Sequence, residues 1–144
     1  MESEGRNLGK SKLRHISWHD VELRLDEVKA EVARKYDSLF GIPRGGLIVA
    51  LLLSYKTGLP VVLDLARITP KTLVVEDIIH TGETIGRLLR ARGSSYPPDI
   101  FALYVRTKKY ALAFPAKQTR DWLIFPWEDE KSSLKDGTFS RLAH

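Results

Sequence analysis

Two adjacent carboxylates follow a short apolar run in the middle of the chain. The segment LVVEDIIHTGETI, at residues 73–85, begins with three aliphatic residues typical of a strand buried on both faces. Glu76 and Asp77 come next, at the carboxyl end of that predicted strand. Ligands of open α/β sheets bind at this edge. Carboxylates placed there suit the hydroxyl groups of a ribose.

A small polar loop comes shortly after the acidic pair. It comprises His80, Thr81, Gly82, Glu83 and Thr84, and it leads into a helical apolar pattern. Backbone amides at a helix start have no partner within the helix, so they suit a phosphate monoester, helped by the helix dipole and by close approach at a glycine. The simpler alternative is a buried strand and a Thr/Gly N-cap with incidental acids. The sequence has no Walker A lysine or GxGxxG fingerprint that would offer another phosphate site.

A second glycine-rich loop, GIPRGG at residues 41–46, also follows an apolar run and opens a helical pattern. Its glycines permit tight backbone geometry, and Arg44 adds a positive charge. The alternative is an ordinary strand-to-helix turn with a solvated arginine. Two phosphate-suited loops, each at the carboxyl end of a predicted strand, are a stronger indication than either loop alone.

Alternating strand and helix patterns predict the elements that position these loops. Ser17 and Asp20 match a capping box, which starts an amphipathic helix at residues 18–36. Gly93 is a predicted C-cap. The other predicted helices are 46–54 and 84–92, and the predicted strands are 38–42, 60–65, 72–76, 100–105 and 122–125. This order predicts an α/β fold with a mainly parallel, doubly wound sheet.

The composition fits one compact domain. A chain of 144 residues with 43% hydrophobic content buries one ordinary core and leaves little for a second. We expect that domain at residues 16–128, with a polar N-terminal tail at 1–15 and a C-terminal tail at 129–144. Without cysteine, a long apolar stretch or a secretory leader, an intracellular soluble protein is expected. The net charge of +5 suits either nucleic acid or a highly phosphorylated substrate, so it does not discriminate.

Residues 73–85 resemble the binding signature for 5-phosphoribosyl 1-pyrophosphate (PRPP) in the type I phosphoribosyltransferases. The resemblance implies that Glu76 and Asp77 orient the ribose hydroxyls and, with water and pyrophosphate oxygens, hold Mg²⁺. It implies that residues 81–84 bind the 5-phosphate. His80 departs from the family pattern, because an aspartate usually stands there and is thought to assist proton transfer at the base. We therefore expect a slower enzyme or a shifted base preference.

The same resemblance extends to the loop at 41–46. In the family, the equivalent loop holds pyrophosphate and contains a non-proline cis peptide. Pro43–Arg44 would be that cis bond, and the Arg44 and Gly45 amides would bind the diphosphate.

A third segment, DWLIFPWE at residues 121–128, is similar to the closing segment of xanthine/guanine and archaeal-type hypoxanthine phosphoribosyltransferases. By that resemblance Trp122 stacks on the purine within a small C-terminal hood, and Leu123 belongs to the same base site. Arg106 stands in place of a family lysine that donates to the exocyclic oxygen of a 6-oxopurine, and its planar fork can reach that edge. The alternatives are core packing for Trp122 and a solvated basic turn for Arg106.

The resemblance implies a cytoplasmic enzyme that salvages a 6-oxopurine with PRPP and Mg²⁺. The alternative is a non-catalytic regulator of the same fold that binds PRPP or nucleotides. Residues 64–71, DLARITPK, favour the alternative, because family members carry a longer mobile loop there, and Arg67 or another subunit would have to cover the site. A homodimer is expected by resemblance, no membrane association is expected, and nucleic acid is a disfavoured but open partner.

Overall fold

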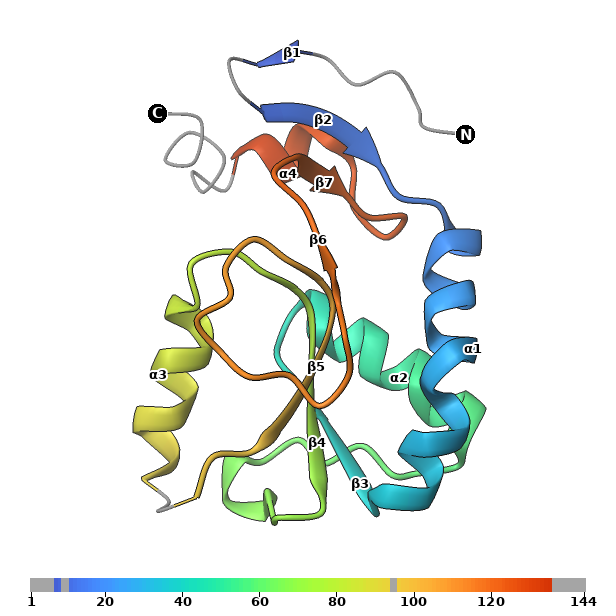
Figure 1. The fold of residues 1–144 in the computed structure, drawn as a ribbon, viewed down its shortest axis with the longest axis vertical. Coiled ribbons are helices and arrows are strands. Elements are labelled where there is room, and N and C mark those ends of the chain that lie inside the picture. The colour runs from blue at the N-terminus through green and yellow to red at the C-terminus, as the bar shows by residue number, and fades with distance from the viewer. Residues whose placement is uncertain (1–6, 9–10, 94–95, 136–144) are drawn as a thin grey trace. The chain divides into compact units, whose positions relative to one another are not determined.

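The computed structural model describes residues 7–8, 11–93 and 96–135, which divide into two compact units. The larger unit comprises residues 24–119, and the smaller unit comprises the described residues up to Leu23 and from Arg120 onward. Each unit has its own sheet (Figure 1). Among the described helices, none is both long and apolar enough to cross a bilayer.

The larger unit is built on a parallel sheet with the order β3-β4-β5-β6. Its strands are β3 (Ser38–Gly41), β4 (Thr72–Ile79), β5 (Asp99–Val105) and β6 (Lys117–Gln118). The helices that connect them are α2 (Gly45–Thr57) and α3 (Glu83–Arg92), with the short 3-10 helix η1 (Leu65–Arg67) before β4. Because every strand pairing is parallel, all carboxyl ends lie at one edge of the sheet.

The chain winds away from the centre of this sheet in two directions. After β3 it passes through α2 to Val61, which bridges to Leu39 on the outer side of β3. After β4 it passes through α3 to β5, on the other side of β4. Figure 1 accordingly shows α2 and α3 on opposite faces of the sheet. The predicted doubly wound arrangement is therefore confirmed, with its switch of direction between β3 and β4.

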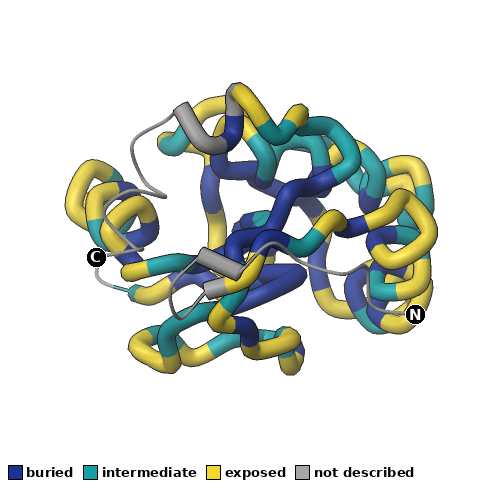
Figure 2. Tube along the Cα trace, turned by 90° about the horizontal axis from the view of Figure 1, so that it is seen from above, coloured by how far each residue is buried: buried dark blue, intermediate teal, exposed yellow. Residues whose placement is uncertain are grey.

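The apolar run of β4 lies at the centre of the core, as predicted. Leu73, Val74 and Val75 are completely buried. Figure 2 shows buried segments of the chain in dark blue and exposed segments in yellow. On one face of the sheet, Val74 clusters with Ile100 of β5 and with Ile85 and Leu88 of α3. Strands that are buried on both faces have continuous hydrophobic sequences rather than alternating ones. This pattern explains why residues 73–75 could be predicted to form a buried strand.

The smaller unit contains β1 (Asn7–Leu8), β2 (Ser11–His15), β7 (Trp122–Ile124) and α4 (Glu130–Lys135). Strand β2 runs parallel to β7 and antiparallel to β1. Residues 11–15 were expected to belong to a polar tail, but they form strand β2. The burial of Leu13 and of Ile16 just beyond it explains the difference, because two apolar residues among polar ones gave a weak signal.

Helix α1 (Trp18–Lys35) begins with the predicted capping box. The Asp20 N–H donates to Ser17 Oγ at 3.1 Å, and the Ser17 N–H donates to Asp20 Oδ2 at 3.0 Å. At the end of α3, Gly93 adopts the predicted left-handed C-cap, with φ of 65°. The two predicted helix caps are confirmed. Each was predictable because it depends on only a few neighbouring residues.

One predicted strand is absent. Residues 60–65 make only a bridge between Val61 and Leu39, in which the Val62 N–H donates to Leu39 O at 2.7 Å. Val62 and Leu65 pack against the core, but Leu63 between them is 77% exposed, so the apolar run does not continue as a buried strand. Strand β4 instead runs three residues further than predicted, to Ile79. The short elements β6 and α4 were not predicted.

Candidate functional site

The carboxyl ends of β3 and β4 form the point where the chain winds in opposite directions. Ligands of open α/β sheets bind at such a point, because the diverging connections leave a crevice above the strands. The Ile42 N–H donates to Val75 O at 3.0 Å, so the loop after β3 starts directly beside β4. The fold therefore brings the two sequence motifs together at this edge.

Gly45 lies against the carboxylate of Asp77. A Cβ atom added at Gly45 would overlap the Asp77 carboxyl group, and one added at Gly46 would lie 2.5 Å from Val75 O and 3.0 Å from Glu76 Oε1. Real Cβ atoms do not approach other heavy atoms so closely, so the first turn of α2 requires glycine at both positions. The peptide bond between Pro43 and Arg44 is cis, as the family resemblance predicts.

Glu76 and Asp77 form a close, buried acidic pair. The Asp77 N–H donates to Glu76 Oε1 at 3.0 Å, and the Ile78 N–H donates to Asp77 Oδ1 at 2.7 Å. Burial raises the pKa of Glu76 well above its usual range, and the neighbouring Asp77 charge adds to the effect. Burial also raises the pKa of Asp77. The pair therefore resists carrying two negative charges unless a cation or hydroxyl donors approach it.

The donor set suits a hard divalent cation but does not complete a site for one. Carboxylate oxygens are ligands that Mg²⁺ prefers, and a cation here would relieve the repulsion within the pair. Within residues 7–8, 11–93 and 96–135, however, no group of three or more potential ligand side chains could hold a metal. The remaining oxygens would have to come from a substrate or from water.

The loop at residues 80–84 forms the start of α3. Gly82 precedes the first helical residue in a left-handed conformation, with φ of 85°. Thr81, Glu83 and Thr84 are exposed, and His80 is half-buried. The Glu83 N–H donates to Thr81 Oγ1 at 3.2 Å. The first-turn amides of a helix have no partner within the helix, so this exposed start presents the groups that an anion would need.

Arg106 lies beside the start of that loop. Val105 pairs with Ile79 across the sheet, and the Arg106 N–H donates to Ile79 O at 2.8 Å. Arg106 and His80, the residues that follow this pair, are therefore neighbours at the carboxyl edge. Both are half-buried. Arg106 of the predicted base site therefore lies next to the start of the predicted phosphate loop, and both belong to the larger unit.

Trp122 and Leu123 belong to the smaller unit, where both are buried. The Trp122 Nε1–H donates to Ser133 Oγ in α4 at 3.0 Å. Trp127 stacks on Phe125 with a centroid distance of 5.0 Å, and Trp18 meets Trp127 edge-on at 5.9 Å. The core-packing alternative describes Trp122 well, and its assignment to a base site stays a prediction.

Residues 64–71 lie at the opposite edge of the sheet from the acidic pair. The Asp37 N–H, just before β3, donates to Lys71 O at 3.0 Å, and the Tyr96 hydroxyl, just before β5, donates to Ile68 O at 3.2 Å. Both contacts are near the amino ends of strands. The suggestion that Arg67 helps to cover the site is therefore wrong, since its segment is tied to the amino-terminal edge.

Sequence reasoning missed Tyr110, which contacts the start of α3. Its hydroxyl donates to Gly82 O at 3.1 Å. The one local signal is the spacing of Gly82 and Gly86, which places two residues without side chains on one helix face. Nothing in the sequence indicates that a tyrosine 28 positions away covers them.

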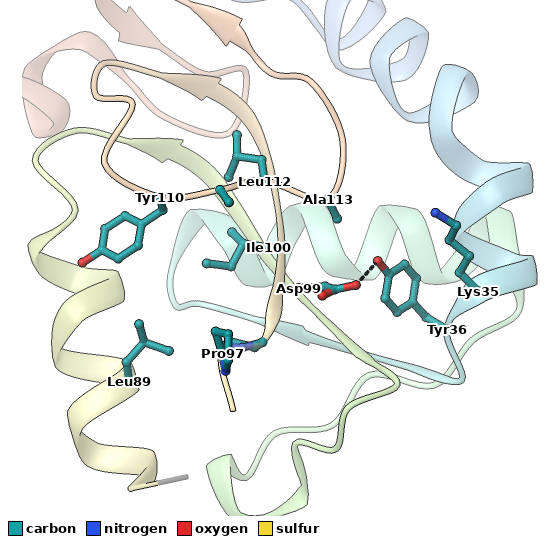
Figure 3. Close-up of a pocket in the computed structure, with 11 residues that line it drawn as sticks. Lys35, Tyr36, Leu89, Pro97, Asp99, Ile100, Tyr110, Leu112 and Ala113 are labelled. Atoms are coloured by element: carbon teal, nitrogen blue, oxygen red, sulfur yellow. Dashed lines mark hydrogen bonds between the residues drawn. The ribbon is translucent and has the colours of Figure 1, made fainter. Parts of the chain in front are cut away.

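A cavity of about 340 Å³ lies beside the amino end of β5 (Figure 3). Its lining includes Leu89, Leu112 and the ring of Tyr110, together with Tyr36 and Asp99. The Tyr36 hydroxyl donates to Asp99 Oδ2 at 2.6 Å, and burial with this contact raises the pKa of Tyr36. The acidic pair does not line this cavity, so it is separate from the candidate site.

The acidic pair generates a prediction about stability. Because folding raises the pKa of Glu76, the folded state keeps a proton that the unfolded chain releases at any pH between the two pKa values. The free energy of unfolding therefore falls as the pH rises through that window. Glu76→Gln keeps an acceptor oxygen but cannot ionise, so urea denaturation at pH 8 should find it about 1–2 kcal/mol more stable than the unsubstituted protein.

The difference should vanish near pH 4, where the carboxyl is protonated in both states. Glu27→Gln, at an exposed position on α1, is the matched control and should leave the pH dependence unchanged. Equal slopes of stability against pH for Glu76→Gln and the unsubstituted protein would contradict the charge repulsion inferred here.

Comparison with known proteins places this site within a known fold. No family model and no curated protein matches the sequence. Among solved structures, a purine phosphoribosyltransferase from Pyrococcus horikoshii matches with a TM-score of 0.66 and 22% identity, over 81% of this chain and 95% of that one. A xanthine-guanine-hypoxanthine phosphoribosyltransferase from Helicobacter pylori matches with a TM-score of 0.63 and 20% identity, over 86% and 99% of the two chains.

A hypothetical protein from Neisseria gonorrhoeae, solved with bound ppGpp, also matches, with a TM-score of 0.59 and 18% identity over 89% of this chain and 93% of that one. All three matches span nearly the whole of the other chain. Together with the parallel sheet, the switch of winding direction and the cis peptide, they show that this chain has the fold of the type I phosphoribosyltransferases.

Proposed function

We propose that this chain is a purine phosphoribosyltransferase that transfers the phosphoribosyl group of PRPP to a 6-oxopurine and releases pyrophosphate. The contact between Gly45 and Asp77 carries the proposal, because it places a glycine-rich loop with a cationic neighbour directly against a buried acidic pair. Three residues separate the end of β4 at Ile79 from the exposed start of α3 at Glu83. Three adjacent groups thus match the diphosphate, ribose and 5-phosphate of PRPP.

Each group has a role in binding PRPP. The amides of Arg44 and Gly45 would bind the diphosphate, with the Arg44 guanidinium adding charge. Residues 81–84 would bind the 5-phosphate, whose oxygens would take the place of Thr81 Oγ1 as acceptor for the Glu83 N–H. Glu76 and Asp77 would accept from the ribose hydroxyls, which relieves the repulsion within the pair.

The proposal includes Mg²⁺, held by Glu76 and Asp77 together with oxygens of PRPP and water. When bound, it neutralises charge that develops on the pyrophosphate leaving group. The protein's own contribution is alignment, because displacement at C1 of the ribose requires both substrates to be held in a reactive geometry.

The contacts proposed for the purine follow the family resemblance. Arg106 would donate to the exocyclic oxygen of the 6-oxopurine, Trp122 would stack on the ring, and Leu123 would contact it. His80, adjacent to Arg106, could exchange a hydrogen bond with the base but supplies no fixed negative charge as a neutral ring. The names of the Pyrococcus and Helicobacter proteins support a purine substrate.

A second candidate is a non-catalytic regulator that binds PRPP or a nucleotide. One observation favours it, because residues 64–71 are tied to the amino-terminal edge and cannot cover the acidic pair. The Neisseria protein of this fold, solved with bound ppGpp, is consistent with such a role. The net charge of +5 keeps nucleic acid open as a disfavoured partner.

The proposal places the protein in the cytoplasm, where nucleotide salvage is expected. It also includes a homodimer. Helix α2 is apolar around much of its circumference, and Leu51 and Tyr55 are 46% and 91% exposed on it. Leu63 nearby in the sequence is 77% exposed. A helix that is hydrophobic all round is normally covered, so this face suits pairing with a second copy.

Turnover is the first test. Pyrophosphate release should occur with PRPP, Mg²⁺ and at least one of hypoxanthine, xanthine or guanine, offered separately, and not with adenine. Asp77→Asn should lower kcat/KM by about 100-fold or more, because it removes a charge aimed at the reacting ribose. Asp64→Asn, an exposed site that keeps its cap to Ala66, is the matched control and should retain activity.

A calorimetric titration of PRPP alongside the assay separates the candidates. PRPP binding without turnover would favour the regulator, and absence of both would overturn each candidate.

The departure at His80 gives a second prediction. His80→Asp restores the family's usual carboxylate next to Arg106, so we expect kcat/KM to rise about 10-fold for at least one 6-oxopurine or the order of preference among bases to change. Steady-state kinetics with each base measure this. Identical rates and preference in the variant would show that this position does not act on the base.

The exposed face of α2 gives a third prediction. Sedimentation equilibrium should give a dimer mass for the unsubstituted protein and a monomer mass for the double variant Leu51→Glu with Tyr55→Glu, because charges replace apolar contact area. Leu23→Glu changes a similarly exposed leucine on α1 and should leave the dimer intact. A monomer mass for the unsubstituted protein would contradict the proposed pairing.

A further inference from the structure

Tyr110 packs against the first turn of α3, which carries the proposed 5-phosphate site. Its hydroxyl donates to Gly82 O at 3.1 Å. A Cβ atom at Gly82 would overlap the tyrosine ring, and one at Gly86 would lie 3.2 Å from the hydroxyl oxygen. Figure 3 shows the ring extending from the loop after β5 with its hydroxyl toward α3. Two glycines four positions apart thus make a flat surface for one tyrosine.

The hydrogen bond acts on a peptide group at the centre of the proposed site. Gly82 O also accepts from the Gly86 N–H at 2.8 Å, so this carbonyl has two donors. In a trans peptide the C=O and the next N–H point in opposite directions. Fixing Gly82 O therefore fixes the direction of the Glu83 N–H, and polarising the carbonyl makes that N–H a better donor.

The ring itself is held in place by its surroundings. The Lys109 Nζ lies 5.6 Å from the ring centroid, and the Lys109 N–H donates to Thr107 Oγ1 at 3.2 Å within the same loop. An ammonium near an aromatic face is attracted to it. The lysine thus places a positive charge near the ring that packs on Gly82.

We infer that Tyr110 is a positioning residue for the 5-phosphate site: its hydroxyl fixes the Gly82–Glu83 peptide so that the Glu83 amide is aimed at the phosphate. This inference rests on the proposed function. It assigns a role to a residue of the loop between β5 and β6, which neither glycine-rich motif includes, and it explains why the 80–86 segment carries glycine at both 82 and 86.

Tyr110→Phe removes the hydroxyl and keeps the ring, so it tests the hydrogen bond without emptying the contact. Isothermal calorimetry with ribose 5-phosphate should give about 3- to 10-fold weaker binding than the unsubstituted protein, the usual effect of one lost hydrogen bond. Binding of inorganic pyrophosphate should be unchanged, because its proposed partners are the amides of Arg44 and Gly45. Tyr110→Ala should weaken ribose 5-phosphate binding further.

Tyr96→Phe is the matched control. The Tyr96 hydroxyl donates to a backbone carbonyl, that of Ile68, at the opposite edge of the sheet, so its loss should leave both affinities unchanged. Thermal unfolding of each variant checks that the fold is retained. Unchanged ribose 5-phosphate binding in Tyr110→Phe, or equal weakening of ribose 5-phosphate and pyrophosphate, would overturn the inference and leave the proposed function standing. Failure of the unsubstituted protein to bind PRPP and both probes would overturn the proposed function and this inference with it.

Discussion

The close approach of α2 to β4 is the constraint on which the candidate site depends. Gly45 and Gly46 allow the first turn of α2 to lie against Asp77, Val75 and Glu76 without a side chain between them. Any larger residue would push the loop after β3 away from the acidic pair. The winding switch between β3 and β4 lies where open α/β sheets bind ligands, and the two glycines bring the loop after β3 against the acidic pair.

Electrostatics at this site oppose folding and favour binding. Burial raises the pKa of both Glu76 and Asp77, and the Asp77 charge raises that of Glu76 further, which means that their ionised forms are destabilised by the fold. Hydrophobic burial of β4 and β5 supplies stability elsewhere in the same unit. An arrangement that costs stability where ligand oxygens or a cation would relieve it is typical of functional sites rather than of structural ones.

The sequence predicted features whose signals are local. The aliphatic run of β4, the capping box at Ser17 and the glycine C-cap at residue 93 each depend on a few neighbouring residues, and each is confirmed. The juxtaposition of the loop at 41–46 with the acidic pair was also predictable, since parallel strands share a carboxyl edge.

Contacts between residues that are far apart along the chain could not be predicted from the sequence. The position of residues 64–71 is set by contacts with Asp37 and Tyr96, which precede two different strands. The contact of Tyr110 with Gly82 joins two loops, and the pairing of β2 with β7 joins the two ends of the described chain. None of these contacts has a recognisable pattern within a short stretch of sequence. Residues 11–15 were therefore predicted to be a tail, and residues 60–65 were predicted to be a strand.

The pairing of β2 with β7 has a consequence for the order in which the protein folds. Leu13 pairs with Trp122, so more than the whole larger unit separates the two strands along the chain. Closing so long a loop carries an entropic cost, and domains form as their residues leave the ribosome. The larger unit has all of its strands before β7 is synthesised, whereas the amino-terminal strands must wait for the last part of the chain. The smaller unit is therefore expected to form last, and until then β2 is an unpaired strand edge exposed to other chains.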